Sequence, residues 1–185
     1  MIKKSVLINL CVALIVVPTV ASAENIMVDD FSRNPSSRWE FIADSVMGGV
    51  SSGEIQFEQQ SGDHTMTLSG NVSTANNGGF IQVRRKLSIE HPKAGTGIIL
   101  TVKGNGEQYF VHLRSFWTML PWQYYQASFQ AGDDWQEVMI PFAAFTPSGR
   151  VLTKTVKPED VRSIGIVAFG RDHEADISVT EIRLY

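Results

Sequence analysis

Short stretches in which apolar and polar residues alternate recur along most of this chain, and this pattern is its strongest constraint on fold. HTMTLSG at 64–70 places Met66 and Leu68 on one side, and EQYFVHLRS at 107–115 alternates in the same way. Successive side chains of a strand point to opposite faces of a sheet, so a period of two is typical of half-buried strands. Turn-forming clusters separate the stretches: SSG, QQSGD, ANNGG, KGNGE and QAGDD. The pattern predicts about ten short strands.

Helical periodicity is almost absent, and only KPEDVRS at 157–163 predicts a short helical turn before a strand. Many short strands with Gly- and Asp-rich turns predict an all-β fold, an antiparallel β-sandwich of jelly-roll type. The alternation also predicts a core between two sheets, with Trp39 at its margin. The predicted core residues are Val111, Leu113, Phe129, Ile140, Phe142, Ile164, Ile166, Val179 and Ile182.

The first 23 residues have the three parts of a secretory signal peptide. MIKK is positively charged, SVLINLCVALIVVPTV is apolar, and ASA is a small-residue cleavage motif. We therefore expect residues 1–23 to be removed after Ala23. Residues 24–185 should form a single domain that is periplasmic or secreted, with no stable membrane anchor after cleavage.

Cysteine content and charge exclude several classes of function. Cys11 is the only cysteine and lies in the predicted signal peptide, so the mature protein should have no disulfide, thiolate nucleophile or cysteine metal site. Removal of Lys3 and Lys4 changes the formal charge from −3 to −5. Since no basic cluster stands out in the sequence, nucleic acid and anionic lipid are expected to be poor partners.

No catalytic motif is evident in the sequence. It contains no HExxH motif and no glycine-framed serine elbow, and its four histidines fall in separate predicted elements. No carboxylates cluster on one face of one strand, so we expect a non-catalytic protein. Tertiary folding could still bring two distant carboxylates together as in a glycosidase, and this alternative stays open.

Carboxylates near the two ends of the mature chain could bind a structural calcium ion, which is the one cofactor that the sequence leaves as a possibility. Asp29 and Asp30 open the first expected strand, and Asp176 and Glu181 lie in the last, which in a sandwich often pairs beside the first. The alternative is a polar strand start that discourages edge-to-edge pairing. No other cofactor is expected.

The stretch WEFIADSVMGGVSSG begins at Trp39, and its adjacent glycines Gly48 and Gly49 predict a tight turn that passes close to a neighbouring segment. Trp39 and Phe41 are expected to anchor the core. The carboxylate of Asp44 has two open roles. It could accept local backbone hydrogen bonds, or it could pair with a cation on the sheet.

Strand parity predicts a ligand site on the outer face of one sheet. If Val111 and Leu113 face the core, their strand neighbours face outward, and the same holds for the stretches around 82 and 125. If these three strands are neighbours in one sheet, their outward residues would form a concave platform that suits a polar ligand, with Asp44 beside it. The alternative is that Asp44 and Arg84 form a buried ion pair and that loops cover the rings. The candidate ligand-binding residues are Asp44, Gln82, Arg84, His112, Arg114, Trp122, Tyr124 and Gln126.

Four motifs in order resemble the complex I intermediate-associated protein 30 family. They are WxFxxDSVMGGVSxG, LSGxVS with NNGGFIQVR, GNGEQYFVHLR, and YQASF followed by WQEVMIPFAAFTP. The resemblance covers Trp39 to about Tyr185. It implies a galactose-binding-like jelly roll, related in fold to carbohydrate-binding modules, and for mitochondrial members a non-catalytic role in assembling respiratory complex I. The motif positions read as structural are Trp39, Gly48, Gly49, Gly79 and Phe80.

Three functions follow as hypotheses. The first is an exported accessory protein, assembly factor or chaperone-like protein that holds a protein partner. The second is a carbohydrate-binding module, and the third is a small jelly-roll enzyme acting on glycans. Fold alone does not decide among them.

Overall fold

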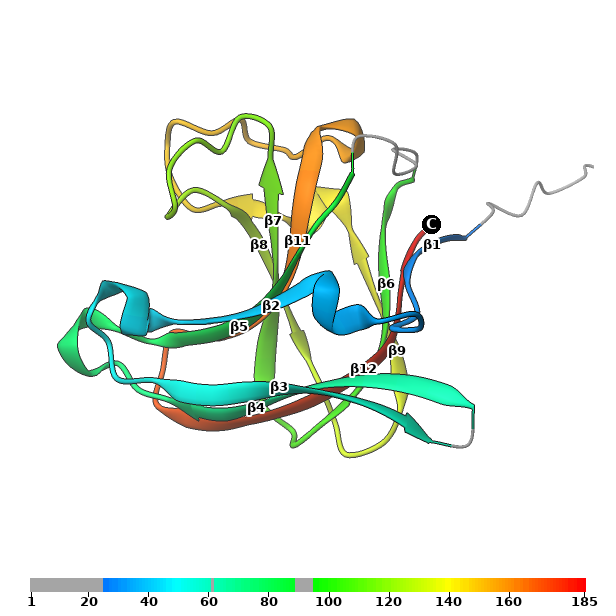
Figure 1. The fold of residues 1–185 in the computed structure, drawn as a ribbon. Helices are drawn as coiled ribbons and strands as arrows, with labels where there is room; N and C mark the ends of the chain where they lie inside the picture. Colours follow the sequence, from blue (N-terminus) through cyan, green and yellow to red (C-terminus); the bar gives the residue numbers. More distant parts are fainter. Residues whose placement is uncertain (1–24, 61, 89–94) are drawn as a thin grey trace, which may run out of the picture.

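The computed structural model describes residues 25–60, 62–88 and 95–185, so the predicted signal peptide lies outside the described residues. Within them the chain folds as two antiparallel sheets packed face to face (Figure 1). The predicted all-β antiparallel sandwich is thereby confirmed. The predicted turn at 157–163 is a short 3-10 helix, η5 (Pro158–Asp160), which leads directly into a strand.

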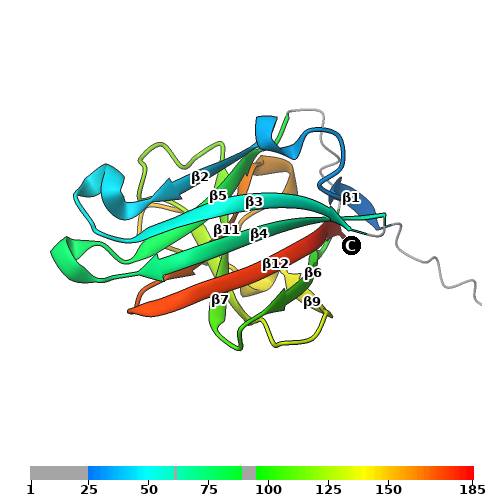
Figure 2. The same cartoon turned by 60° about the horizontal axis from the view of Figure 1, so that its bottom comes forward.

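The first sheet has the strand order β3-β4-β12-β6-β9, and β1 pairs with the end of β12. Figure 2 shows β3, β4 and β12 running side by side along its length. Its strands are β1 (Ile26–Asp29), β3 (Ser52–Gln60), β4 (Asp63–Val72), β6 (Gly97–Gly104), β9 (Gln136–Pro141) and β12 (His173–Leu184).

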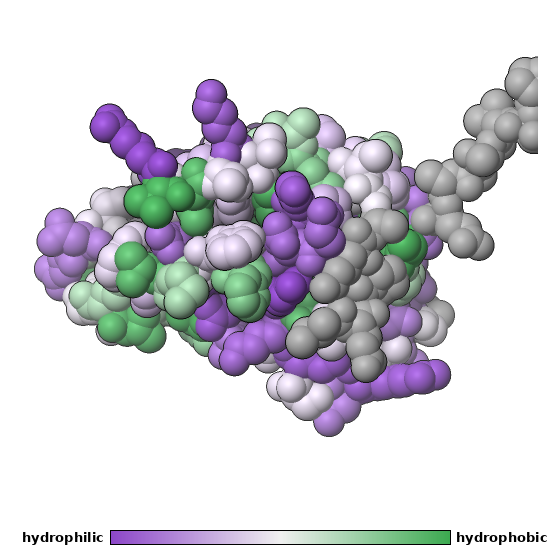
Figure 3. Space-filling view, turned by 90° about the horizontal axis from the view of Figure 1, so that it is seen from above, coloured by the Kyte–Doolittle hydropathy of each residue, from purple (hydrophilic) through white to green (hydrophobic). Residues whose placement is uncertain are grey.

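The second sheet has the strand order β10-β8-β7-β11-β5-β2. Its connections from β7 to β8 and from β10 to β11 lie at the end of the sandwich that Figure 3 views from above. Its strands are β2 (Trp39–Ala43), β5 (Phe80–Lys86), β7 (Gln108–Ser115), β8 (Tyr125–Gln130), β10 (Thr146–Pro147) and β11 (Val161–Phe169).

The core between the sheets contains all nine predicted residues, each buried. Trp39 is also buried and contacts the ring of Phe31 at a centroid distance of 5.5 Å. Phe41 is only partly buried and packs at the edge of the core. The regular alternation of β7 explains why its core residues were predicted correctly. Val111 and Leu113 point inward at every second position, and the strand has no interruption between them.

A buried carboxylate, Asp29, ties the two sheets together at one edge. The indole N–H of Trp39 donates to it at 2.8 Å, and the guanidinium of Arg38 lies at 3.0 Å. Arg85 of β5 forms a second ion pair with the same carboxylate. Because Asp29 ends β1 and its partners belong to the second sheet or lead into it, this network fixes how the sheets meet.

Candidate functional site

The predicted platform strands share one sheet, but β11 lies between β5 and β7, which the strand-neighbour hypothesis did not foresee. Cross-strand pairing sets a single row of residues across the outer face. The row runs through Thr146, Gln126, His112, Gly165, Arg84 and Glu40. Three predicted candidates therefore lie in one row, and its other members, Thr146, Gly165 and Glu40, were not predicted.

Gly165 contributes no side chain to the row between His112 and Arg84, and its backbone is buried. A Cβ atom here would stand 3.2 Å from the carbonyl oxygen of Val83 and 3.4 Å from Oε1 of Gln82. A glycine inside a strand often marks close approach by a ligand or another backbone. The glycine in SIGIVAFG was thus the available signal for this position.

His112 lies at the centre of the row with its ring stacked on Tyr124. Burial lowers the pKa of His112 to about 4, and the neighbouring Gln126 amide opposes this only in part. Nε2 of His112 and Oε1 of Gln126 are shielded from solvent, and neither has a hydrogen-bond partner of normal geometry. Buried polar atoms are nearly always paired, and the Gln126 side chain is the hydrogen-bonding group that acts on the His112 imidazole, so these two atoms belong to one cross-strand pair.

The two platform arginines have different partners. Arg84 donates to the carboxylate of Glu40 from Nε at 2.9 Å and from Nη2 at 2.7 Å, so the expected alternative of an Asp44–Arg84 pair is wrong. Arg114 donates to backbone carbonyls in the following loop. Burial lowers the pKa of Arg114, and the nearby charge of Arg84 lowers it further, so the two cations face a shared region.

Trp122 departs from the parity prediction. It lies in the connection between β7 and β8 rather than on β8, and its side chain is largely exposed. The carbonyl oxygen of Trp122 accepts from the hydroxyl of Ser148. Trp122 thus stands at the rim of the face, while Tyr124, two residues on, reaches the row itself.

Asp44 is fully buried and lies away from the platform, which removes it from the candidate site. Its carboxylate accepts from the N–H and hydroxyl of Ser51 and from the N–H groups of Gly79 and Phe80. Burial favours a raised pKa for Asp44, but these hydrogen bonds together lower it. Of its two open roles, the acceptor of local hydrogen bonds is the one observed.

The glycines of the opening motif have the expected structural roles. Gly48 has φ of 91° at the end of η2 (Asp44–Met47), a conformation that side chains rarely adopt. A Cβ at Gly49 would fall 2.3 Å from Cγ of Asp44, and one at Gly78 would fall 2.4 Å from Oδ2. The close approach is therefore to the Asp44 carboxylate rather than to a neighbouring strand.

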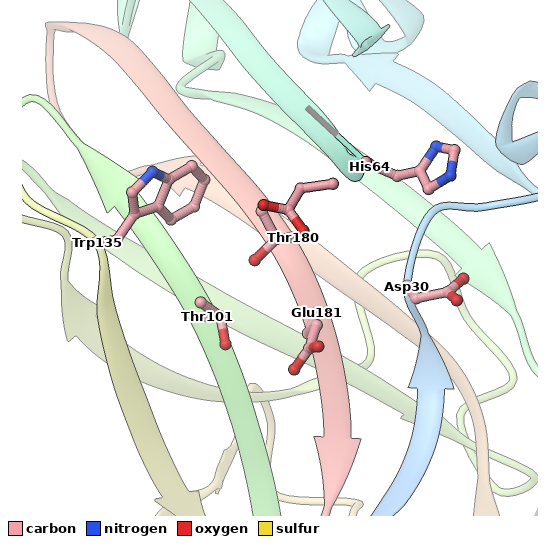
Figure 4. A pocket seen from close by; sticks show the side chains of 8 residues that line it. Asp30, His64, Thr101, Trp135, Thr180 and Glu181 are labelled. Carbon is pink, nitrogen blue, oxygen red and sulfur yellow. The ribbon is translucent and has the colours of Figure 1, made fainter. Parts of the chain in front are cut away.

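A pocket of about 440 Å³ lies on the outer face of the first sheet (Figure 4). A bulge between Val179 and Glu181 turns both Thr180 and Glu181 outward, which interrupts the strand parity. Trp135 flanks one side of the pocket, and Asp30 and His64 lie on the other. Its donors and acceptors could hold a small polar ligand.

The expected calcium ligands do not meet at this pocket. Asp29 is engaged by two arginines, and Asp176 is an exposed residue of β12 outside the pocket lining. Only Asp30 and Glu181 border the pocket, and Glu181 pairs with Arg183 at 3.2 Å. Across the described parts of the chain, no group of three or more His, Cys, Asp or Glu side chains is arranged to hold a metal.

Comparison with solved structures defines the class of fold. The Family 11 carbohydrate-binding module from Clostridium thermocellum, solved in complex with a β-1,3-1,4-mixed-linked tetrasaccharide, superposes with a TM-score of 0.70 at 16% identity, covering 89% of this chain and 96% of that chain. The Family 30 module of the cellulosomal cellulase Cel9D-Cel44B of Clostridium thermocellum gives 0.51 at 12% identity, covering 74% and 90%. An exo-β-agarase gives 0.54 at 10% identity, covering 86% of this chain but 25% of that chain. The chain has the jelly-roll fold of these modules.

The family model for complex I intermediate-associated protein 30 matches residues 30–179, and the chain belongs to this family. The resemblance carried by the four sequence motifs is thereby confirmed. No curated protein matched the sequence of the chain. In the portions that the structure describes, there is no helix long and apolar enough to cross a membrane.

Proposed function

We propose that this protein is a non-catalytic binding protein that holds an oligosaccharide on the outer face of its second sheet. The observation that carries the proposal is the row through Gln126, His112 and Arg84, which sets an amide, an imidazole and a guanidinium across the outer face of one sheet. Sugars present hydroxyl groups at their edges and apolar C–H faces, so they suit a surface that combines rings with planar polar groups.

Each part of the row has a separate task in this proposal. The partly exposed side chains of Gln82, Arg84 and Gln126 meet sugar hydroxyls. Tyr124 supports the His112 ring by stacking, and its own ring borders the same face. Arg84 and Arg114 supply cationic donors to one shared region of the face, which favours sugars that carry a carboxylate.

A protein partner is the second candidate ligand, and family membership favours it. Family members in mitochondria are associated with assembly of respiratory complex I, a task of holding other proteins. A polypeptide segment could lie across the same row, with its backbone groups meeting Gln82 and Gln126. A catalytic role is not proposed, because the row contains no paired carboxylates and Glu40 is engaged by Arg84.

We also propose that the mature protein begins at Glu24 and acts outside the cytoplasm, as the signal-like sequence of residues 1–23 predicts. Sequencing the N-terminus of protein from fractionated cells tests this separately from binding. Recovery of an uncleaved chain from the membrane pellet would contradict it.

Calorimetric titration of the mature protein tests ligand class, first with β-1,3-1,4-mixed-linked glucan oligosaccharides and then with hits from a glycan array. We expect at least one oligosaccharide to bind, and His112→Ala and Gln126→Ala to weaken that binding about tenfold each. Gln59→Ala, an exposed glutamine on β3 of the other sheet, is the matched control and should bind normally. Failure of every glycan to bind, or equal binding by all variants, would contradict the proposal.

A further inference from the structure

The connection between β7 and β8, residues 116–124, exposes an unusual number of large apolar side chains. Five of them are between 43% and 81% exposed. Monomeric proteins rarely show apolar groups gathered in this way unless they contact a partner or a membrane. We call this group the apolar loop surface, which consists of Phe116, Trp117, Met119, Leu120 and Trp122.

Polar groups of the loop hold it in this shape. Arg114 donates to the carbonyl oxygens of Thr118 at 3.1 Å and Leu120 at 2.9 Å. The side-chain oxygen of Gln123 accepts from the N–H groups of Met119 and Leu120. The backbone polar groups are thus satisfied within the loop while the apolar side chains point to solvent, so their exposure follows from an ordered conformation.

A second connection, from β10 to β11, lies directly beside the apolar loop surface. The N–H of Phe116 donates to the carbonyl of Asp160, and the N–H of Ser148 donates to the carbonyl of Tyr124. The guanidinium of Arg162 lies 5.8 Å from the centre of the Phe116 ring. Figure 3 looks down on this end of the molecule and shows hydrophobic side chains gathered beside extended hydrophilic ones.

The second connection has a net positive charge, whereas the whole chain has a net negative charge. Residues 148–162 contain four cations and two anions, whereas the chain has a formal charge of −3. The outer face of the other sheet has the opposite character, because carboxylates of Asp30, Asp63 and Glu181 border its pocket. The four cations of residues 148–162 are Arg150, Lys154, Lys157 and Arg162, and Arg162 is the one that contacts the Phe116 ring.

We propose that the apolar loop surface docks reversibly onto an anionic lipid bilayer. Trp and Phe side chains favour the membrane interface, where apolar rings enter the headgroup region and cations meet anionic headgroups. Each cation near such a surface adds attraction that salt weakens. The overall negative charge of the chain does not argue against this binding, because a bilayer meets only one end of the molecule. At this end, residues 148–162 carry more cations than anions.

Co-sedimentation with lipid vesicles tests the proposal directly. The mature protein is mixed with vesicles of phosphatidylcholine alone or with about one third phosphatidylglycerol, at low and high salt. We expect binding to the anionic vesicles only, weakened at high salt. The double variant Trp117→Ser, Met119→Ser should lose about tenfold in partitioning, and Lys154→Gln, Lys157→Gln should lose the anionic preference.

Trp135→Ala is the matched control, because Trp135 is a half-exposed tryptophan on the other sheet's pocket. It should bind vesicles as the parent does. Thermal unfolding of each variant verifies folding, since the loop's polar contacts through Arg114 and Gln123 are unchanged. The proposal is wrong if the parent stays in the supernatant with anionic vesicles, if the loop variant sediments like the parent, or if the parent instead binds only a protein through this surface.

Discussion

The imidazole ring of His112 lies flat against the phenol ring of Tyr124, with 4.0 Å between the ring centroids and 12° between the planes. Burial favours the neutral form of both groups. It lowers the pKa of His112 to about 4, and it raises the pKa of Tyr124. Both rings are therefore uncharged at pH 7. The centre of the row is neutral, while its charged members, Arg84 and Glu40, lie on the far side of Gly165.

The depressed pKa of His112 should make stability depend on pH. Between about pH 4 and pH 6.5 the unfolded chain binds a proton at this position and the folded chain does not, so the free energy of unfolding rises with pH. Urea unfolding at pH 4.5 and pH 7.0 should show a contribution of about 2 kcal/mol that His112→Gln removes. Equal pH dependence in the parent and the variant would contradict the buried, neutral imidazole.

The Asp44 turn should not tolerate a side chain at Gly49. An alanine Cβ there would overlap the Asp44 carboxylate and disturb its hydrogen bonds to Ser51 and Gly79. Gly49→Ala should lower the free energy of unfolding by about 2–4 kcal/mol. Gly132→Ala is the control, because no atom lies within 4 Å of its ideal Cβ. Similar melting temperatures for both variants would show that the turn is not packed in this way.

The adjacent arginines Arg84 and Arg85 should differ sharply in their effect on stability. Arg85 pairs with Asp29, whose side chain is only 2% exposed, whereas Arg84 pairs with Glu40, whose side chain is 50% exposed. Arg85→Ala leaves a buried carboxylate short of a partner and should cost about 3–5 kcal/mol. Arg84→Ala should cost about 1 kcal/mol or less. Thermal unfolding of the two variants tests this difference. A larger loss of stability in Arg84→Ala than in Arg85→Ala would contradict the assignment of the ion-pair partners.

Much of the fold was predictable because burial follows parity in an unbroken strand. Val111 and Leu113 repeat every second position of β7 and are buried, while His112 between them is only partly buried. Parity fails where the strand is irregular. The bulge in β12 sends Thr180 and Glu181 to the same face, and alternation alone gives no indication of it.

The candidate site was predictable in its side chains but not in its arrangement. Alternation placed His112 and Gln82 outward correctly, yet it could not order the strands, because pairing between distant segments leaves no local pattern. The position of β11, and with it Gly165, was therefore missed. Asp44 was misplaced because a carboxylate that faces backbone N–H groups looks the same in sequence as one that faces a ligand.

Binding by a Gly165→Leu variant tests most directly whether the row through His112 and Arg84 holds the ligand. Calorimetric titration with the best oligosaccharide is compared between this variant, Gly165→Ala and the parent, with melting temperatures recorded alongside. We predict that Gly165→Leu loses binding about a hundredfold, because its side chain would stand in the row between His112 and Arg84. Gly165→Ala, whose Cβ needs a shift of only a few tenths of an ångström, should bind more weakly than the parent but detectably. A folded Gly165→Leu protein that binds the oligosaccharide as tightly as the parent would contradict the proposed site.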